Sequence, residues 1–154
     1  MALTLYSNKI DRYNERSLTN TTSTTYAIGD ALTLTSGKLV AVSAGTQLIA
    51  GVAESAVTSA VAGTKGQVLV PDADTIFSIA PSSGSPDATK IGQFANITGS
   101  SGAMKLDTTT IATAPTSANT GTGVITALQL AIVGVDPDTT ANYLVSIHAR
   151  QLTR

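Results

Sequence analysis

The sequence predicts an all-β protein, a small β-barrel or β-sandwich preceded by an extended N-terminal arm. Short apolar runs that alternate with polar residues recur along its 154 residues and are separated by Gly, Ser and Pro. The apolar residues, 42% of the chain, are mostly Ala, Val, Leu and Ile, and aromatic residues make up 4%. A core of such small side chains fits a narrow sandwich or barrel better than a thick α/β architecture.

Residues 1–25 are expected to form the arm, and residues 26–154 are expected to form the β-domain. Residues 1–6 alternate weakly as a strand, and residues 19–25 contain only Thr, Asn and Ser. A tract of this composition has little to bury and favours an extended backbone. We therefore expect the arm to become ordered on a partner. The alternative is an ordinary N-terminal strand followed by a loop.

A β-hairpin is expected next. Ala31–Thr35 alternates with period two, Ser36-Gly37 has the composition of a turn, and Lys38–Val42 alternates again. A buried strand follows over Leu48–Ala53. Its central residue, Gly51, predicts a bulge or the close approach of another backbone.

Two further strands are expected in the middle of the chain. They are Gln67–Val70 and Thr75–Ile79, which Pro71 and Pro81 terminate. Residues 81–89 have the composition of a loop.

The last third of the chain predicts two more strands. Thr126–Val135 contains helix-favouring Ala, Leu and Gln in its first half, but its Ile and Val residues and the following Asp-Pro-Asp turn favour a strand. We choose the strand. Tyr143–His148 is an apolar final strand.

The second half of the chain repeats a pattern of the first half. Ile28–Thr35 matches Ile91–Thr98 as Ile-Gly-x-x-x-x-Leu/Ile-Thr. Two shorter matches are Lys38-Leu39 with Lys105-Leu106 and Gly51-Val52 with Gly134-Val135. If a duplication produced these matches, residues 26–80 and 90–150 are two repeated lobes of one β-architecture. Chance similarity is the alternative, because Gly, Thr and Leu are common in this chain.

Residue types that carry out catalysis are scarce. The chain has no Cys, no Trp and a single His, His148, and its only glutamates are Glu15 and Glu54. General acid–base chemistry needs a titratable group with a partner that orients it. We therefore expect no enzyme, no cofactor and no small-molecule substrate, and we expect His148 to lie at an edge or on the surface.

Two pairs of aspartates occur in predicted turns. They are Asp72 with Asp74 and Asp136 with Asp138. Carboxylates at this spacing are a possible start of a calcium loop, but the other ligand positions of such a loop are missing. Asp in these positions is ordinary turn chemistry, so no metal site is expected.

The charge pattern argues against nucleic acid and membrane partners. The net charge is −1, and charged residues make up 12% of the chain, about half the usual share. No basic field is available to attract phosphate groups. We expect neither a signal peptide nor a membrane span, because residues 1–6 lack a basic region and apolar runs stay short. Synthesis in a cytoplasm is expected.

Four segments together resemble a known family. They are Ile28-Gly-Asp-Ala-Leu, Gly37-Lys-Leu-Val-Ala-Val, Ile49-Ala-Gly-Val-Ala53 and Gly63-Thr-Lys-Gly-Gln-Val-Leu-Val70. In this order they resemble the capsid decoration, or cement, proteins of tailed bacteriophages, in which such strands build a small β-barrel or β-sandwich. The resemblance covers residues 26–80 directly and residues 90–150 only through the internal match.

This resemblance implies a structural protein of the virion. Such a protein binds the outer surface of an assembled phage head, often as a trimer, and bridges neighbouring major capsid proteins. Its partners are then the capsid lattice and other copies of itself. An extended arm can add a strand to a neighbour's sheet edge, and the anchors expected in the arm are Leu3, Leu5, Tyr6, Ile10 and Tyr13. The alternative is another virion component, such as a head-fibre or tail protein.

Overall fold

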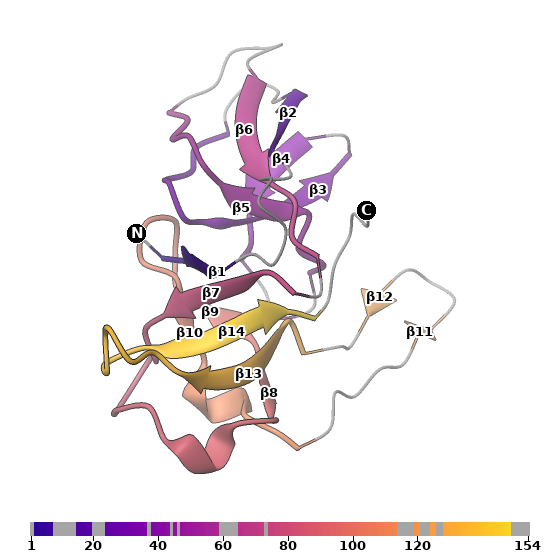
Figure 1. Cartoon of the computed structure of the whole chain (residues 1–154). Helices are drawn as coiled ribbons and strands as arrows, with labels where there is room; N and C mark the ends of the chain where they lie inside the picture. Colours follow the sequence, from indigo (N-terminus) through magenta and orange to yellow (C-terminus); the bar gives the residue numbers. More distant parts are fainter. Residues whose placement is uncertain are drawn as a thin grey trace.

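Two five-stranded antiparallel sheets form the framework of the computed structural model (Figure 1). Sheet A has the spatial order β1 (Thr4–Ser7), β7 (Ile76–Ile79), β14 (Tyr143–Ile147), β13 (Leu130–Val135) and β8 (Phe94–Ala95). Sheet B has the order β2 (Glu15–Thr19), β6 (Lys65–Leu69), β5 (Gly51–Ala53), β3 (Ala31–Thr35) and β4 (Lys38–Ala41). The predicted all-β class, a small barrel or sandwich, is confirmed.

Short elements complete the fold. They are the ribbon of β9 (Ile97–Thr98) and β10 (Lys105–Leu106), the ribbon of β11 (Asn119–Thr120) and β12 (Val124–Ile125), and the 3-10 turns η1 (Ala88–Lys90) and η2 (Thr108–Thr110). The structure describes residues 2–7, 15–19, 24–36, 38–43, 45, 47–58, 65–72, 74–113, 119–120, 124–125 and 128–148. Both sheets curl. In sheet B the Cα atoms of β2 and β4, the two edge strands, approach within 8 Å.

Most strands form where alternation predicts them. In β14, Tyr143, Val145 and Ile147 are buried, and the residues between them are partly exposed. The hairpin of β3 and β4 is confirmed, and Ser36 at its turn has a φ of +51°. The strand that we chose over a helix for Thr126–Val135 is also confirmed, although β13 begins only at Leu130.

The N-terminal segment differs from the expected free arm. β1 pairs with β7 in sheet A, and β2 pairs with β6 in sheet B. Leu3 is only 2% exposed and belongs to the core. Burying a Leu side chain contributes about 1.5–3 kcal/mol, which favours docking over a solvated extension. Among the described residues, the segment therefore forms strands of the protein's own sheets.

The two halves of the fold have the same strand order. We call β2 to β6 the N-terminal unit, and β7 to β10 with β13 and β14 the C-terminal unit. In the N-terminal unit the pairing order is β2-β6-β5-β3-β4. In the C-terminal unit it is β7-β14-β13-β8, after which the chain continues into β9 and its partner β10. β1 is an additional strand beside β7.

The registers of the two units also correspond. Equivalent cross-strand pairs are Leu34 with Leu39 and Ile97 with Leu106, Thr35 with Lys38 and Thr98 with Lys105, and Leu32 with Gly51 and Ala95 with Leu130. The amide of Gly29 donates to the carbonyl of Ala53 at 2.8 Å, and the amide of Gly92 donates to that of Ile132 at 2.9 Å. Gly29 and Gly92 both have a φ of +86°, a conformation that favours glycine.

The same registers show that the two Gly-Val pairs are not equivalent. Gly51 corresponds to Leu130, because each lies opposite the matching residue of the preceding strand. Gly134 instead follows an irregularity in the pairing of β13 with β14. Gly51 thus has one of the two roles expected for a mid-strand glycine, the close approach of another backbone, because an added Cβ would meet the carbonyl oxygen of Leu69 at 2.7 Å. Gly134 has the other, because it lies next to the irregularity in the strand pairing.

Buried polar side chains join the two units. Asp30, which is fully buried, accepts hydrogen bonds from the Oγ of Ser101 at 2.5 Å and from the amide of Gly102 at 2.8 Å. Gln129, also fully buried, donates to the carbonyl of Gln47 at 2.7 Å and accepts from the amide of Ile97 at 2.9 Å. One hydrophobic cluster includes side chains of both sheets. The units therefore share a core and do not form separate domains.

Candidate interaction surface

The structure separates the five side chains expected to anchor a partner. Leu3 lies in the protein's own core, and Leu5 packs against that core while remaining partly exposed. Tyr6, 40% exposed, lies where the pairing of β1 with β7 shifts by one residue. Ile10 and Tyr13 lie outside the described residues. Of the described three, Leu5 and Tyr6 are accessible to a partner, and Leu3 acts by fixing β1 in place.

β1 borders an apolar cleft of about 190 Å³ between the two units. Its lining consists of Leu3, Leu5, Ile28, Gly29, Val52, Ala53, Glu54, Leu69 and Phe77. The amide of Leu3 donates to the carbonyl of Gly29 at 2.9 Å, which fixes the position of β1 against the turn at 28–29. Leu5 lies opposite Phe77 in the pairing of β1 with β7. An apolar side chain of a partner fits this lining chemically, because burial of apolar surface favours association.

Ile28 at the cleft was not among the expected contact residues. It is 46% exposed, although Ile is a residue type that is usually buried. Its position follows from Gly29, whose positive φ turns the chain and leaves the preceding side chain outside. The sequence signal that could have identified this exposed position is the Ile-Gly pair, which recurs in both halves of the internal match. Ile91, before Gly92, occupies the corresponding turn of the C-terminal unit and is 47% exposed.

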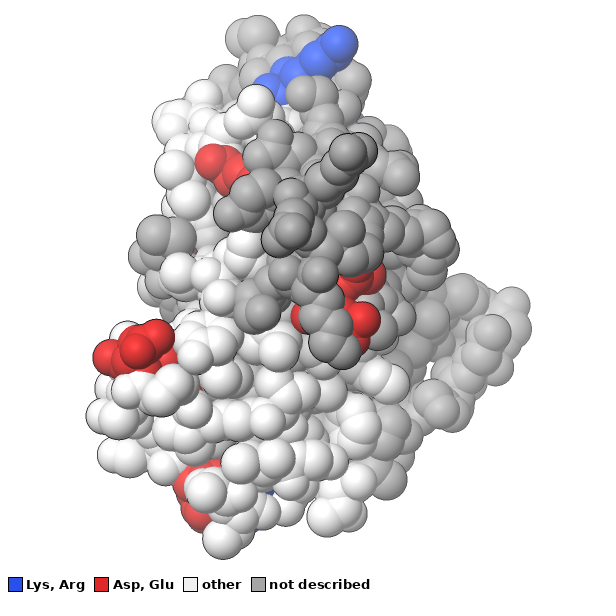
Figure 2. Space-filling view, in the orientation of Figure 1, with Lys and Arg blue, Asp and Glu red and all other residues white. Residues whose placement is uncertain are grey.

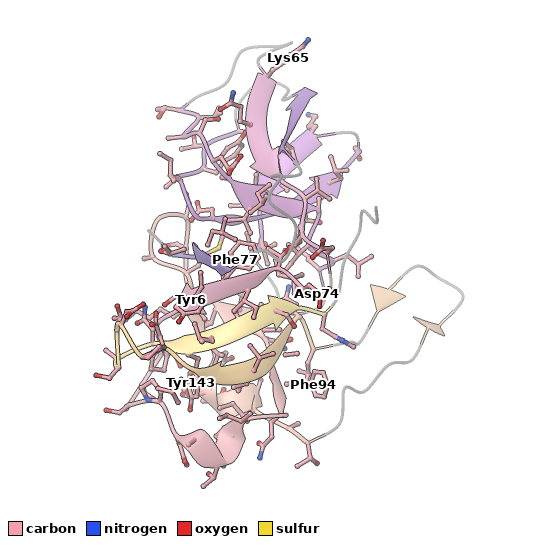
Figure 3. All side chains as sticks on the ribbon, in the orientation of Figure 1. Tyr6, Lys65, Asp74, Phe77, Phe94 and Tyr143 are labelled. Atoms are coloured by element: carbon pink, nitrogen blue, oxygen red, sulfur yellow. The ribbon has the colours of Figure 1, made fainter. Side chains whose placement is uncertain are left out.

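The outer face of sheet A is a second accessible surface. β13 and β14 lie in front of β9 and β10 in Figure 1, so this face is turned toward the reader. Its partly buried or exposed side chains are Ile76, Phe94, Ala131, Val133, Leu144 and Ser146. Figure 2 shows an uncharged area between acidic groups over this part of the molecule, and Figure 3 places Asp74 at one end of the sheet. Val133 is 43% exposed.

Both aspartate pairs form turns, as expected. The Oδ1 of Asp72 accepts hydrogen bonds from the amide of Asp74 at 3.0 Å and from the Oγ1 of Thr75 at 2.8 Å. The Oδ1 of Asp136 accepts from the amide of Asp138 at 2.9 Å. In the described part of the chain, no three His, Cys, Asp or Glu side chains are grouped as metal ligands.

Asp136 is buried, and its second oxygen is also engaged. Its Oδ2 accepts from the Oγ of Ser78 at 2.5 Å, and the amide of Thr139 donates to Oδ1 at 3.1 Å. The hydrogen bond from Ser78 and those from the turn amides hold the pKa of Asp136 below its ordinary value of 3.8, against the opposing effect of desolvation. The ionised carboxylate thus fixes the β13–β14 turn to β7.

Asp136→Asn is expected to make stability less dependent on acid pH. Because the folded-state pKa is lowered, ionised Asp136 stabilises the fold fully above its unfolded pKa. This contribution is lost as the pH falls through the folded-state pKa. Urea unfolding at pH 7 should give a higher free energy of unfolding for the wild type than for Asp136→Asn. The difference between the two proteins should shrink at pH 4 and further at pH 2.5. Asp138→Asn, at an exposed side chain of the same turn, is the control. A difference that stays constant with pH would contradict this assignment.

His148 is exposed, immediately after β14. Its ring packs edge-on against Phe94, with 5.0 Å between the ring centroids. Its amide donates to the carbonyl of Gln129, which extends the pairing of the last two long strands. His148 thus lies at the end of the central strand of sheet A, beside Phe94.

Comparison with protein-family models, with curated proteins and with solved structures finds no match for this chain. Within the described residues, no helix has the length and apolar character needed to cross a membrane. The described residues present two accessible apolar surfaces, which are the cleft beside β1 and the outer face of sheet A.

Proposed function

We propose that this chain is a decoration, or cement, protein of a tailed-bacteriophage head. It binds the outer surface of the assembled shell and stabilises it by bridging neighbouring major capsid proteins. The protein is made in the host cytoplasm and is located on the outer capsid surface of the virion. Its action is mechanical and involves no catalysis.

The observation that carries this proposal is the cleft beside β1, with exposed apolar side chains at an edge strand. β1 is the outermost strand of sheet A. An extended segment of a capsid protein can add to such an edge through main-chain hydrogen bonds. Ile28 and Leu5 then supply apolar contacts beside it. These contacts are few, but many copies on one shell add their effects, so that each can be modest.

Composition supports the same function. Charged residues make up 12% of the chain, and the net charge is −1. A surface with few charges repels neighbours weakly and therefore suits dense packing on a lattice. The resemblance of residues 26–80 to decoration proteins adds support that is independent of the cleft.

The test is co-sedimentation with shells assembled from the major capsid protein of the same phage. The wild-type chain should pellet with shells, and expanded and unexpanded shells should be compared. Ile28→Asp is expected to weaken binding about tenfold or more, because it places a charge at the apolar contact. Ile91→Asp is the matched control. Ile91 is 47% exposed, against 46% for Ile28, and it precedes Gly92 in the corresponding turn of the C-terminal unit, but it lies outside the cleft lining.

Point substitutions are preferable to removal of the N-terminal segment, because β1 and β2 are strands of the two sheets. Failure of the wild-type chain to pellet with either form of shell would overturn the proposed function. Equal binding by Ile28→Asp and Ile91→Asp would exclude the cleft as the contact site.

A further inference from the structure

β1 presents main-chain groups to the cleft beside it. The amide of Leu3 donates to the carbonyl of Gly29 at 2.9 Å, so the main chain at Leu3 faces away from β7. Because the main-chain groups of successive strand residues point to opposite edges, those of Leu5 face away from β7 as well. No described residue forms a hydrogen bond with these groups of Leu5. The edge of β1 at Leu5 is therefore open to a further strand.

The surroundings of Leu5 limit where such a strand can lie. On the N-terminal side the carbonyl of Gly29 already accepts from Leu3, so an added strand cannot continue along β1 past this residue. On the other side the pairing of β1 with β7 shifts between Leu5 and Ser7, and such a shift disrupts the regular ladder. Leu5 is therefore the position at which an added strand forms a regular pair of hydrogen bonds.

The side chain that lies opposite Leu5 in an added strand enters the cleft. Directly opposite residues place their side chains on the same face of a sheet, and Leu5 lines the cleft together with Ile28 and Val52. Thr4 and Tyr6 point to the other face and are exposed. The cleft volume of about 190 Å³ is smaller than the roughly 300–1,000 Å³ of small-molecule sites. It suits one apolar side chain, with polar residues on either side of it.

Glu54 gives the cleft a charge preference. Its side chain is part of the cleft lining and is partly exposed. Residues two positions from the apolar residue of an added strand lie on the same face as that residue, toward the cleft walls. A Lys or Arg there is attracted by the carboxylate, whereas an Asp or Glu is repelled. Charge complementarity therefore favours a basic segment over an acidic one.

We propose that the cleft beside β1 binds an extended segment with one apolar residue, a polar residue on each side of it, and a Lys or Arg two positions away. The apolar residue pairs with Leu5 through its own N–H and C=O, so it is not proline. Main-chain bonds supply affinity and the cleft supplies specificity. That the segment belongs to the major capsid protein rests on the proposed function, but the chemistry of recognition does not.

The experiment is an NMR titration of the full chain with the blocked peptide Ac-Lys-Thr-Leu-Thr-Lys-NH2. We expect a dissociation constant of about 1 mM, with a shift and slower hydrogen exchange of the Leu5 amide. In one altered peptide N-methylleucine replaces the leucine, which removes the main-chain donor. In another, Asp replaces the leucine, which removes the apolar side chain. Each altered peptide should bind about tenfold more weakly or worse.

Glu54→Gln tests the charge preference. The wild-type chain should bind the Lys peptide several times more tightly than Ac-Glu-Thr-Leu-Thr-Glu-NH2, because the Glu residues meet a like charge. In Glu54→Gln the two peptides should bind about equally. Asp138→Asn is the matched control, since it removes an exposed carboxylate outside the cleft lining and should leave the preference unchanged.

A Leu5 amide that does not respond at about 10 mM peptide would overturn the proposal. Equal binding of the N-methylated peptide would do so too, and so would an unchanged preference in Glu54→Gln. Shell binding is measured separately. A chain that binds the peptide but does not pellet with shells overturns the proposed function alone, and a chain that pellets but does not bind the peptide overturns only this inference.

Discussion

Replacing Asp30 with Ala is expected to lower the free energy of unfolding by about 3 kcal/mol or more. Asp30 is fully buried, and its two oxygens accept from the amides of Ala27 and Gly102 and from the hydroxyl of Ser101. Hydrogen bonds to a charged group contribute about 1.5–3 kcal/mol each, and the substitution removes three of them at once. Because two of the donors lie in the β9–β10 hairpin, the substitution also loosens the contact between the units.

Urea unfolding at pH 7 and amide hydrogen exchange measure these effects. Exchange should accelerate most at Ala27 and Gly102, whose amides lose their acceptor. Asp87→Ala is the control, since exposed Asp87 caps η1 through the amide of Thr89 and its replacement should lower the free energy of unfolding much less. A loss for Asp30→Ala no larger than that of the control would show that Asp30 does not hold the units together.

Local features of the fold are predictable from the sequence because their causes are local. Alternation and the Ser-Gly turn fix the β3–β4 hairpin, and Pro71 and Pro81 follow the ends of β6 and β7. The position of residues 2–7 is different. Their weak alternation indicates a strand, but the choice of β7 as partner depends on an edge formed about 70 residues later. Long-range pairing leaves no trace in local composition.

The surfaces illustrate the same limit. Leu3 and Tyr6 look alike in the sequence as apolar residues of an arm, yet one is 2% exposed and the other 40%. Only the pairing of β1 determines which side chain faces inward. The exposure of Ile28 follows from the positive φ of Gly29. The Ile-Gly match between the two halves marked this turn, but a pattern of residue types does not show which side chains the turn exposes.

The buried connections between units are a further case. Gln129 precedes β13 in a segment whose Ala, Leu and Gln residues favour helix by intrinsic propensity. The structure uses its amide to join the carbonyl of Gln47 to the amide of Ile97. Tertiary hydrogen bonding therefore outweighs local propensity at this position, since an unpaired buried amide costs more than a weak helix preference provides.

Gly51→Ala is expected to destabilise the protein by about 3 kcal/mol, at the upper end of the cost of overpacking. A Cβ at this position would lie 2.2 Å from the Cγ1 of Val68 and 2.7 Å from the carbonyl oxygen of Leu69. The side chain of Val68 can shift, but the Leu69 carbonyl belongs to β6, the neighbour of β5 in the sheet. Relief therefore requires movement of the strand itself. The free energy of unfolding from urea titration, compared with the wild type, measures the effect.

Gly134→Ala is the matched control, because it is the other mid-strand Gly-Val glycine and its added Cβ would meet Leu144 only at 3.5 Å. This substitution should be neutral or slightly stabilising, since Ala restricts the unfolded chain. A double variant, Gly51→Ala with Val68→Ala, tests which neighbour causes the cost. It should stay destabilised, because the Leu69 carbonyl is still in the way and a methyl-sized void is added beside it. Recovery to wild-type stability would mean that Val68 alone makes the site intolerant of a side chain, and that the backbones of β5 and β6 are not the constraint.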